Sequence, residues 1–585
     1  MKAAIRRGMV CSLLVGALVT GRAEVARACG GFFCNPGGTL GPLPVAQTGE
    51  NVLFFVSPDP AGGSPKIEAH IQIFYTGQAD KFSWVLPIDA QPDPPDVGSD
   101  AIFTTLDAVT RPQFQVSYHD EGVCKSGPEI PGGGGTMAGL PRAAPPPSVN
   151  GATGGVDVSF RGAVGPFDAA VIHSTDPAAL KDWLVTNGYV VSDDAFRIIG
   201  AYVSENKYFV ALKLLSGKDV TAIRPIVLRF NADAPCIPLR LTAIAALADL
   251  RVNLWVVAPH RTVPQRYQEI LLNEAKIDWL QGGGNYDQLL KEAANEAGGD
   301  AFGVEYAGTS HVMDRKLWYD GLYNLAALRT AATPPAFLAA LGSMPFARDA
   351  KLLALLEKYI PEPKSLVDKG IDERSFYNQL AFYWQMIPDE FAPFDPGAFA
   401  DELDATLVKP LAAAQALFDQ GPYLTRLATF ISPEEMTKDP LFVFNADLGD
   451  VPAVRQADAT YECGLMAYSH CDAPLRLNLP DGRTLRFLPD PSVQNGACYG
   501  APGAYQRGDI DNLPSLATAW DRADSGPGTV VMDNSKMITT GIDAHNAGTE
   551  DGCGCAVRGK AARGLGVVLA ALALAASLRR RRQRR

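Results

Sequence analysis

Apolar and polar residues alternate along the first third of the chain. In residues 67–73 every second position is apolar, and Glu68, His70 and Gln72 stand between them. A period of two is typical of a half-buried strand, and short runs rich in β-branched and aromatic residues between Pro/Gly clusters indicate further strands. The predicted strands are residues 52–56, 67–75, 82–88, 208–215, 226–230, 239–247 and 252–257. Residues 29–262 are therefore predicted to form a β-rich domain.

The period changes to three and four residues from about Gln265, which predicts helices. These helices are residues 286–297, 334–341, 350–359, 373–386, 398–408 and 410–420. An earlier helix is predicted between Asp176, as N-cap, and Gly188, beyond its end. Ser432 and Glu435 have the spacing of a capping box, which is a signature of a helix N-terminus. Residues 263–442 are predicted to form a helical domain.

Alternation returns near the end of the chain. Leu475, Leu477 and Leu479 alternate with polar residues, residues 480–483 read Pro-Asp-Gly-Arg, and residues 484–488 continue the pattern. This predicts a β-hairpin within residues 443–498. The Gly/Pro/Ala-rich residues 125–155 predict a disordered insertion, and the polar, aperiodic residues 499–552 predict a flexible stalk. The predicted fold class is α+β.

The first 28 residues have the pattern of a secretory signal peptide. Lys2, Arg6 and Arg7 precede an apolar run over residues 8–19, and small residues follow at Ala26 and Ala28. Cleavage after Ala28 leaves Cys29 as the first mature residue, and cleavage after Ala23 is the second option. A lipid on Cys29 is an open alternative, although Arg27 fits poorly in a lipoprotein cleavage site.

The last 33 residues, 553–585, combine Cys553 and Cys555, an apolar stretch over residues 564–578 and, after that stretch, six arginines. Fifteen helical residues span roughly 22 Å, against a hydrocarbon core of about 30 Å. The arginines predict that the C-terminus lies inside and the body outside. A lasting membrane anchor and a removable sorting signal both fit; the short span favours the removable signal. A buried core helix is the remaining alternative.

The charge of the body excludes one class of function. The chain carries −12, the signal region +4 and the residues after Cys555 +9, so removing both ends leaves −25. Such a body repels phosphate backbones and anionic headgroups. We therefore expect no nucleic-acid partner.

Seven cysteines lie between the two ends, and an exported chain keeps cysteines as disulfides. The candidates are Cys29, Cys34, Cys124, Cys236, Cys463, Cys471 and Cys498. The expected pairs are Cys29 with Cys34, Cys124 with Cys236, and Cys463 with Cys471 or Cys498, which leaves one cysteine over. His470 stands among the last three, so a zinc site is the alternative. The oxidising compartment favours the disulfide, and no metal or other cofactor is predicted.

No catalytic motif is present in the sequence. His70 is placed on the polar face of a strand, where a solvated or hydrogen-bonded histidine is the expected state. The other histidines are scattered without a ligand cluster: His119, His173, His260, His311 and His545. No catalytic residue is therefore predicted.

Several stretches resemble the domain of unknown function 2330 family. They are Cys-Gly-Gly-Phe-Phe-Cys at residues 29–34, then residues 45–56, 69–73, 82–87, 425–427 and 432–440. The resemblance covers roughly residues 29–450 and implies no activity, because that family is uncharacterised.

The tail resembles the MYXO-CTERM sorting signal, which joins a cysteine, a short apolar helix and an arginine cluster. The resemblance implies recognition by an intramembrane sorting protease and display at the cell surface or outer membrane. The processed cysteine would be Cys553 or Cys555. Without processing, the chain would stay anchored in the inner membrane with its body outside.

Two hypotheses about function remain. The first is a surface-displayed binding or structural module. The second is an extracellular hydrolase whose site is assembled from residues distant in sequence. A deep pocket with converging polar groups and perturbed titratable residues would favour the hydrolase, and a flat or grooved surface without them would favour the binding or structural module.

Overall fold

The computed structural model describes residues 46–76, 82–124, 155–189, 191–215, 223–345, 350–464, 470, 473–490 and 505–550. The chain divides into a larger unit (Met1–Val116, Glu129–Ala457 and Pro514–Ile538) and a smaller unit (Ser117–Pro128, Asp458–Leu513 and Thr539–Arg585). Several predictions lie outside the described residues: the signal peptide with Ala28, Cys29 and Cys34, the insertion 125–154, Cys471, Cys498, and the tail with Cys553, Cys555 and residues 564–578. Within the described ranges, no helix has the length and apolar character needed to cross a bilayer.

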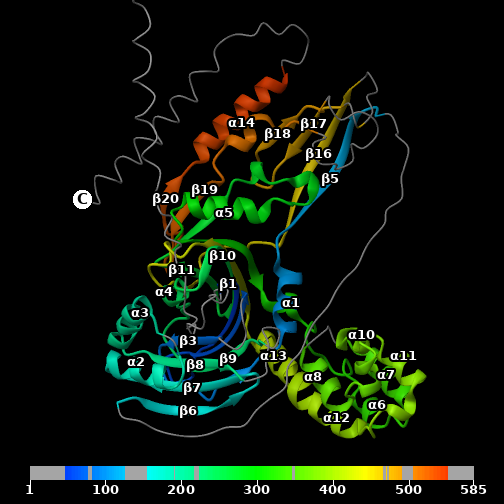
Figure 1. Ribbon diagram of the computed structural model, residues 1–585. Coiled ribbons are helices and arrows are strands. Elements are labelled where there is room, and N and C mark those ends of the chain that lie inside the picture. The colour runs from blue at the N-terminus through cyan, green and yellow to red at the C-terminus, as the bar shows by residue number, and fades with distance from the viewer. Residues whose placement is uncertain are drawn as a thin grey trace, which may run out of the picture. The chain divides into compact units, whose positions relative to one another are not determined.

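A ten-stranded sheet runs through the larger unit in the order β20-β19-β12-β13-β14-β10-β1-β2-β9-β4 (Figure 1). Neighbours pair antiparallel except β1 with β10 and β12 with β13. Its strands are β1 (Ala46–Ser57), β2 (Lys66–Thr76), β4 (Asp96–Val97), β9 (Ile226–Asn231), β10 (Ala246–Ala258), β12 (Gln268–Leu272), β13 (Ala301–Thr309), β14 (Tyr423–Ile431), β19 (Leu516–Asp521) and β20 (Thr529–Asp533). The predicted domain boundary at residue 262 therefore falls inside one continuous sheet.

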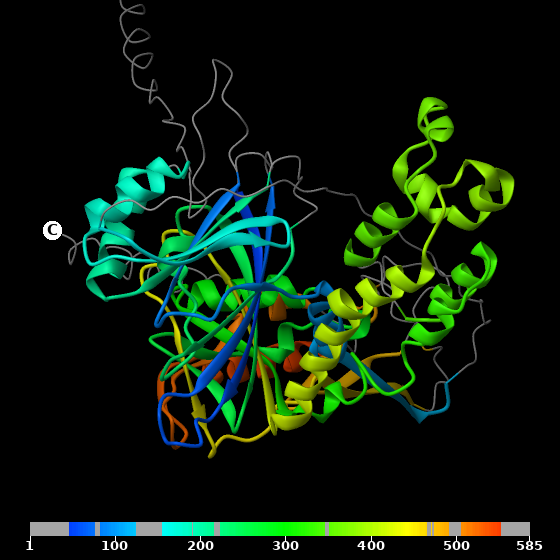
Figure 2. The ribbon, with the colours of Figure 1, turned by 90° about the horizontal axis from the view of Figure 1, so that it is seen from below.

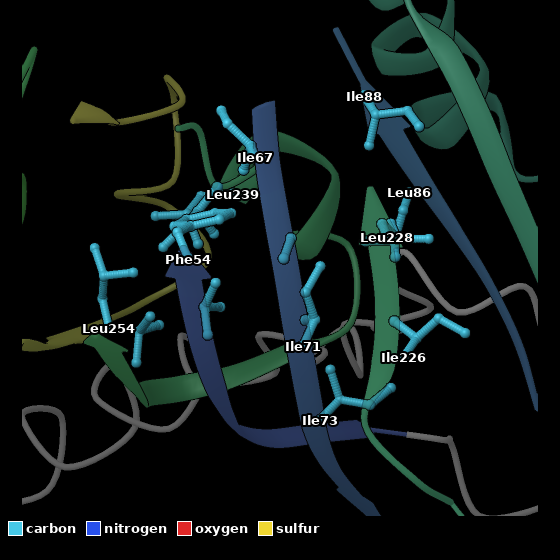
Figure 3. Packing of buried hydrophobic residues seen from close by; sticks show 14 of the residues in the cluster. Phe54, Ile67, Ile71, Ile73, Leu86, Ile88, Ile226, Leu228, Leu239 and Leu254 are labelled. Carbon is cyan, nitrogen blue, oxygen red and sulfur yellow. The ribbon is translucent and has the colours of Figure 1, made fainter. Parts of the chain in front are cut away.

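A second, antiparallel sheet packs on one face of the first. Its order is β3-β8-β7-β6, with β3 (Ser83–Ile88), β6 (Asp157–Val164), β7 (Phe167–His173) and β8 (Tyr208–Leu214). One apolar core contains side chains of both sheets, among them Phe54, Leu228 and Leu86 (Figure 3). Burial of this apolar surface from water is the main force that holds the two sheets together.

Helices cover the outer face of the second sheet. These are α2 (Pro177–Thr186) and α3 (Asp193–Ser204), which lie beside β7 and β8 in Figure 1. Trp183 and Ile199 of the helices share a core with Phe209 of β8. As predicted, Asp176 caps α2: its side chain accepts a hydrogen bond from the backbone N–H of Ala178.

The other face of the ten-stranded sheet packs on helices, many of which lie in sequence between β13 and β14. They gather on one side of the unit in Figure 2. Phe55 of β1 contacts Phe418 of α13 (Lys409–Gln420), with ring centroids 4.9 Å apart. Both side chains belong to the apolar core between the sheet and these helices. The helices of this face are α1 (Asp100–Thr110), α6 (Leu325–Arg329), α7 (Pro334–Gly342), α8 (Ala350–Tyr359), α9 (Lys364–Asp368), α10 (Glu373–Asn378), α11 (Leu380–Met386), α12 (Pro396–Leu403) and α13 (Lys409–Gln420).

The larger unit also contains two more strands and two more helices. The strands β11 (Arg261–Gln265) and β15 (Leu441–Asn445) form an antiparallel pair. Helix α5 (Tyr286–Glu296) begins at the residue predicted from its period. Residues 239–247, predicted as a strand, instead form the short helix α4 (Leu239–Thr242), and β10 begins after it. One helical turn after Pro238 buries both Leu239 and Leu241.

The smaller unit contains the sheet β18-β17-β16-β5. Its strands come from β5 (Gln113–Gly122), β16 (Val454–Gly464), β17 (Leu475–Asn478) and β18 (Thr484–Phe487). The predicted hairpin is confirmed as the antiparallel pair of β17 and β18. Gly482 in its turn has a φ of 83°, a conformation that glycine adopts without steric cost.

Cys124 and Cys463 form a disulfide with Cα atoms 5.2 Å apart, whereas Cys236 is a free thiol. The predicted pairings of Cys124 with Cys236, and of Cys463 with Cys471 or Cys498, are therefore wrong. Residues 124 and 463 are 339 positions apart and meet because β5 and β16 are neighbours in the sheet. A strand pairing of this range leaves no local mark in the sequence.

Two further predictions differ from the structure. The predicted stalk over residues 499–552 includes β19, β20 and α14 (Ser535–Glu550), since sparse apolar residues such as Leu516 and Ile538 are fully buried. The Ser432 and Glu435 pair forms half of a capping box, because the backbone N–H of Ser432 donates to the Glu435 carboxylate at 2.8 Å. A turn follows instead of a helix, and Ser432 Oγ accepts from the backbone N–H of Asp249 at 3.0 Å.

Candidate ligand-binding pocket

A polar pocket of about 490 Å³ lies in the larger unit, within the size range of small-molecule sites. Its walls come from the ends of strands and the loops beside them, over sequence positions from 64 to 441. The lining residues are Ser64, Asp89, Glu205, Lys207, Asn231, Ala232, Asp233, Ala234, Cys236, Arg240, Arg266, Asp439 and Leu441. Charged side chains of both signs therefore face one cavity.

Arg240 is held in the wall by two carboxylates. Its guanidinium donates to both oxygens of Glu205 at 3.0 Å and from Nε to Asp439 Oδ2 at 2.8 Å. Burial opposes its charge, but Glu205, Tyr202 and Asp439 raise the pKa of Arg240 above its usual value. The buried Asp439 also accepts the Tyr202 hydroxyl at 2.8 Å. A bidentate guanidinium with both carboxylates in place is a rigid part of the wall.

Lys207 is the second cation with a partner, because its Nζ forms an ion pair with Asp89. It follows Asn206, which has a φ of 58° and ends the turn between α3 and β8. Asn206 also bonds the ring of His173 at 3.1 Å. Asparagine tolerates the left-handed region better than most residues. The turn therefore fixes where Lys207 enters the pocket.

Two charges of the pocket have no ion-pair partner among the described residues. Asp233 accepts a hydrogen bond from Ser64 Oγ at 2.7 Å, and no cation pairs with it. Arg266 stands in the turn between β11 and β12 with a φ of 68°. A positive φ is uncommon for a residue with a side chain. Arg266 and Asp233 are thus the two charges left for a ligand.

Cys236 is a partly buried thiol in the same wall. Burial raises its pKa, and the charges of Asp439 and Asp89 raise it further, against the smaller opposing effect of Lys207 and Arg266. The thiol therefore stays protonated at neutral pH. A protonated thiol is a poor nucleophile and a poor metal ligand.

Among these lining residues the sequence offered only Cys236 as a candidate site residue, for a disulfide that does not form, and Asp439 only as part of the stretch that resembles the family. No motif marks the site, because its lining residues come from several segments spread over positions 64 to 441. Arg266 has an unusual backbone conformation, but a φ angle cannot be read from a sequence.

His70 lies apart from the pocket and is buried, with 4% of its surface exposed. The prediction placed it on a polar face, but its ring packs against that of Phe55 of β1, with the ring centroids 5.7 Å apart. Its Nε2 bonds Glu68 at 2.9 Å, and Glu68 pairs with Arg229 at 2.6 Å. Burial opposes ionisation of Glu68, but His70 and Arg229 lower the pKa of its carboxyl to about 2. The expectation of a hydrogen-bonded histidine is confirmed, and the solvated alternative is wrong.

His470 of the smaller unit lies beside the disulfide. Donor atoms of Asp120, Cys124 and His470 all come within 4.8 Å of one another. The sequence analysis grouped His470 with Cys463 and two other cysteines. The pairing of β5 with β16 also brings the Cys124 sulfur to His470.

The comparisons with known proteins give one match. The sequence model of the DUF2330 family, described as an uncharacterized protein conserved in bacteria, matches residues 64–367. The chain matches no curated protein and no solved structure. The matched range spans more than half of the chain and includes most of the pocket wall, from Ser64 to Arg266. The chain therefore belongs to the DUF2330 family.

Proposed function

We propose that this chain is an exported, surface-displayed binding module whose ligand occupies the polar pocket. The export part is supported by the charge and hydropathy pattern of residues 1–28 and by the cysteine, apolar stretch and arginine cluster of residues 553–585. The binding part rests on the pocket itself. An intramembrane sorting protease and the membrane are its proposed partners during delivery.

The observation that carries the binding proposal is the pair of charges without a partner. Arg266 supplies a guanidinium that suits a carboxylate, and Asp233 supplies a carboxylate that suits an ammonium group. A molecule that carries both groups, such as an amino acid or a short peptide, complements both. The other charged side chains are already paired, so the ligand would meet a wall that needs little rearrangement, which favours affinity.

The alternative of an extracellular hydrolase is disfavoured by the chemistry of the wall. Nucleophilic catalysis needs an activated group beside a general base. Cys236 is the thiol of the pocket, its pKa is raised, and no histidine is among the lining residues. Binding without turnover fits these groups better.

The ligand proposal predicts a loss of binding in two charge variants. Arg266→Gln and Asp233→Asn each remove one end of the electrostatic match, so each should weaken binding of a zwitterion by about tenfold or more. Isothermal titration of the protein with the twenty amino acids and a set of dipeptides measures this. Arg315→Gln is the matched control, because Arg315 is an exposed arginine with a φ of 57° outside the pocket. Asp320→Asn, also exposed and outside the pocket, controls for the acid. The proposal fails if no zwitterion in the panel binds, or if the controls weaken binding as much as the pocket variants.

The sorting proposal makes a separate prediction. In the chain with Cys553→Ala and Cys555→Ala together, we expect the mature protein to keep its arginine tail, because the processed cysteine is absent. Mass spectrometry of the C-terminal peptide after cell fractionation detects the tail directly. Single variants show which of the two cysteines is used. Unchanged maturation in the double variant would refute processing at these cysteines.

A further inference from the structure

The surroundings of the disulfide contain more polar groups than a structural crosslink needs. Cys124 follows the end of β5, and Cys463 lies in β16 with none of its surface exposed. Asp120 and His470 bring an oxygen and an imidazole nitrogen to the same place, within 4.8 Å of the Cys124 sulfur and of each other. One sulfur, one imidazole and one carboxylate therefore converge, and the Cys463 sulfur is bonded to the sulfur of this group.

The imidazole is already held in position. Its Nε2 lies 2.9 Å from Asp120 Oδ1, and its ring centroid lies 4.5 Å from that of Tyr461. The backbone carbonyl of His470 accepts a hydrogen bond from the Tyr505 hydroxyl at 3.2 Å. A donor set that is oriented before the ion arrives loses less conformational freedom on binding.

We propose that the Cys124–Cys463 disulfide masks a zinc site, which opens when the disulfide is reduced. An external dithiol breaks the S–S bond through thiol–disulfide exchange and leaves as a cyclic disulfide, and its two electrons and two protons convert the bridge into two thiols. Zn²⁺ then displaces both thiol protons and binds the thiolates of Cys124 and Cys463, His470 and Asp120. The ion also replaces the contact between the imidazole and the Asp120 carboxylate.

The donor set selects the ion. Two thiolates, one imidazole and one carboxylate match the four-coordinate tetrahedral sites of Zn²⁺. Ca²⁺ and Mg²⁺ prefer oxygen donors alone, so they fit this donor set poorly. In the oxidised protein the sulfurs lack the negative charge of thiolates, so zinc binds weakly there. Zinc affinity should therefore appear on reduction and disappear on reoxidation. This site belongs to the smaller unit and does not depend on the pocket proposal.

Zinc titration of the full chain tests the proposal, with a chromophoric chelator as competitor. After reduction with a phosphine, which brings no thiol of its own, the wild type should bind one more Zn²⁺ than it binds in oxidised form. Co²⁺ in place of zinc should give the absorption of a tetrahedral thiolate site. In the reduced state, His470→Ala and Asp120→Asn should each weaken zinc binding by about tenfold or more.

Two controls keep the result specific. The double variant Cys124→Ser with Cys463→Ser should lose the additional zinc, whereas Cys471→Ser should keep it. If the double variant does not fold, His470→Ala and Asp120→Asn decide, because both can be purified with the disulfide intact and reduced afterwards. Equal zinc binding by the oxidised and reduced wild type would overturn the proposal, as would tight binding by the reduced His470→Ala and Asp120→Asn variants.

Discussion

Replacing Arg426 with alanine is expected to lower the free energy of unfolding by about 3–5 kcal/mol, the usual range for breaking a buried ion pair by removing one partner. Arg426 lies in β14 with none of its side chain exposed, and its Nε pairs with Glu305, which is equally buried. Nη2 donates to Asp107 at 2.8 Å. In the alanine variant the buried Glu305 carboxylate loses one of its two arginine partners and keeps only Arg251.

Urea unfolding followed by tryptophan fluorescence measures the effect. The Arg426 guanidinium lies 4.8 Å from the centre of the Trp255 ring, and Trp255 is 1% exposed. The signal therefore includes the surroundings of Arg426, together with those of the six other tryptophans. Arg251, at 3.0 Å from Glu305, is the remaining cation near the carboxylate in the variant. Burial opposes its charge, but Glu305 and Asp287 raise the pKa of Arg251, so it stays charged.

A surface pair provides the control. Arg329 and Asp401 form an ion pair at 2.8 Å with side chains 38% and 72% exposed. Arg329→Ala should lower stability by less than about 1 kcal/mol, because water screens exposed pairs. If Arg426→Ala were no more destabilising than Arg329→Ala, the buried network would not stabilise the sheet.

The contribution of Glu50 of β1 to the free energy of unfolding should fall between pH 4.5 and pH 7. Its side chain is buried, and burial raises its pKa from 4.5 to about 7, although a hydrogen bond from Gln47 acts in the opposite direction. A raised folded pKa means that the folded state keeps the proton after the unfolded chain has lost it. The stabilisation is complete below pH 4.5 and is lost as the pH rises toward 7, by about 3 kcal/mol in total.

The variant Glu50→Gln isolates this effect, because glutamine keeps the shape of the side chain without a titrating group. The difference in free energy of unfolding between variant and wild type should move in favour of the variant as the pH rises from 4.5 to 7, and then level off. Urea titrations across this range measure the difference. Glu434→Gln, at an exposed site, should show a difference that does not depend on pH. Parallel pH profiles for wild type and Glu50→Gln would contradict the assignment.

Local pattern predicted most of the elements and little of their arrangement. The strands over residues 52–56, 67–75 and 226–230 were found because their apolar residues follow the period of a strand. The hairpin of β17 and β18 was found because its turn chemistry lies within a few residues. Helices α10 and α11 were predicted as one, since their apolar spacing continues through the break at Gln379.

The candidate sites were beyond the reach of local pattern. The pocket joins residues from position 64 to position 441, and the donor set at His470 needs a strand that begins near residue 113. Cysteine counting assigned Cys236 to a disulfide, whereas the fold leaves it in a pocket wall. The buried state of His70 depends on contacts with other segments, such as that with Phe55 of β1, and β2 alone does not encode them.

By itself, the sequence determined the α+β class, the elements with a clear hydrophobic period and the membership in the family that its residues resembled. These properties depend on neighbouring residues, where side-chain periodicity and turn chemistry act directly. The tertiary structure alone decided which cysteines pair, which charges remain without a partner and which carboxyl is buried. Those properties arise from contacts between residues hundreds of positions apart, because burial and charge compensation depend on what the fold brings together.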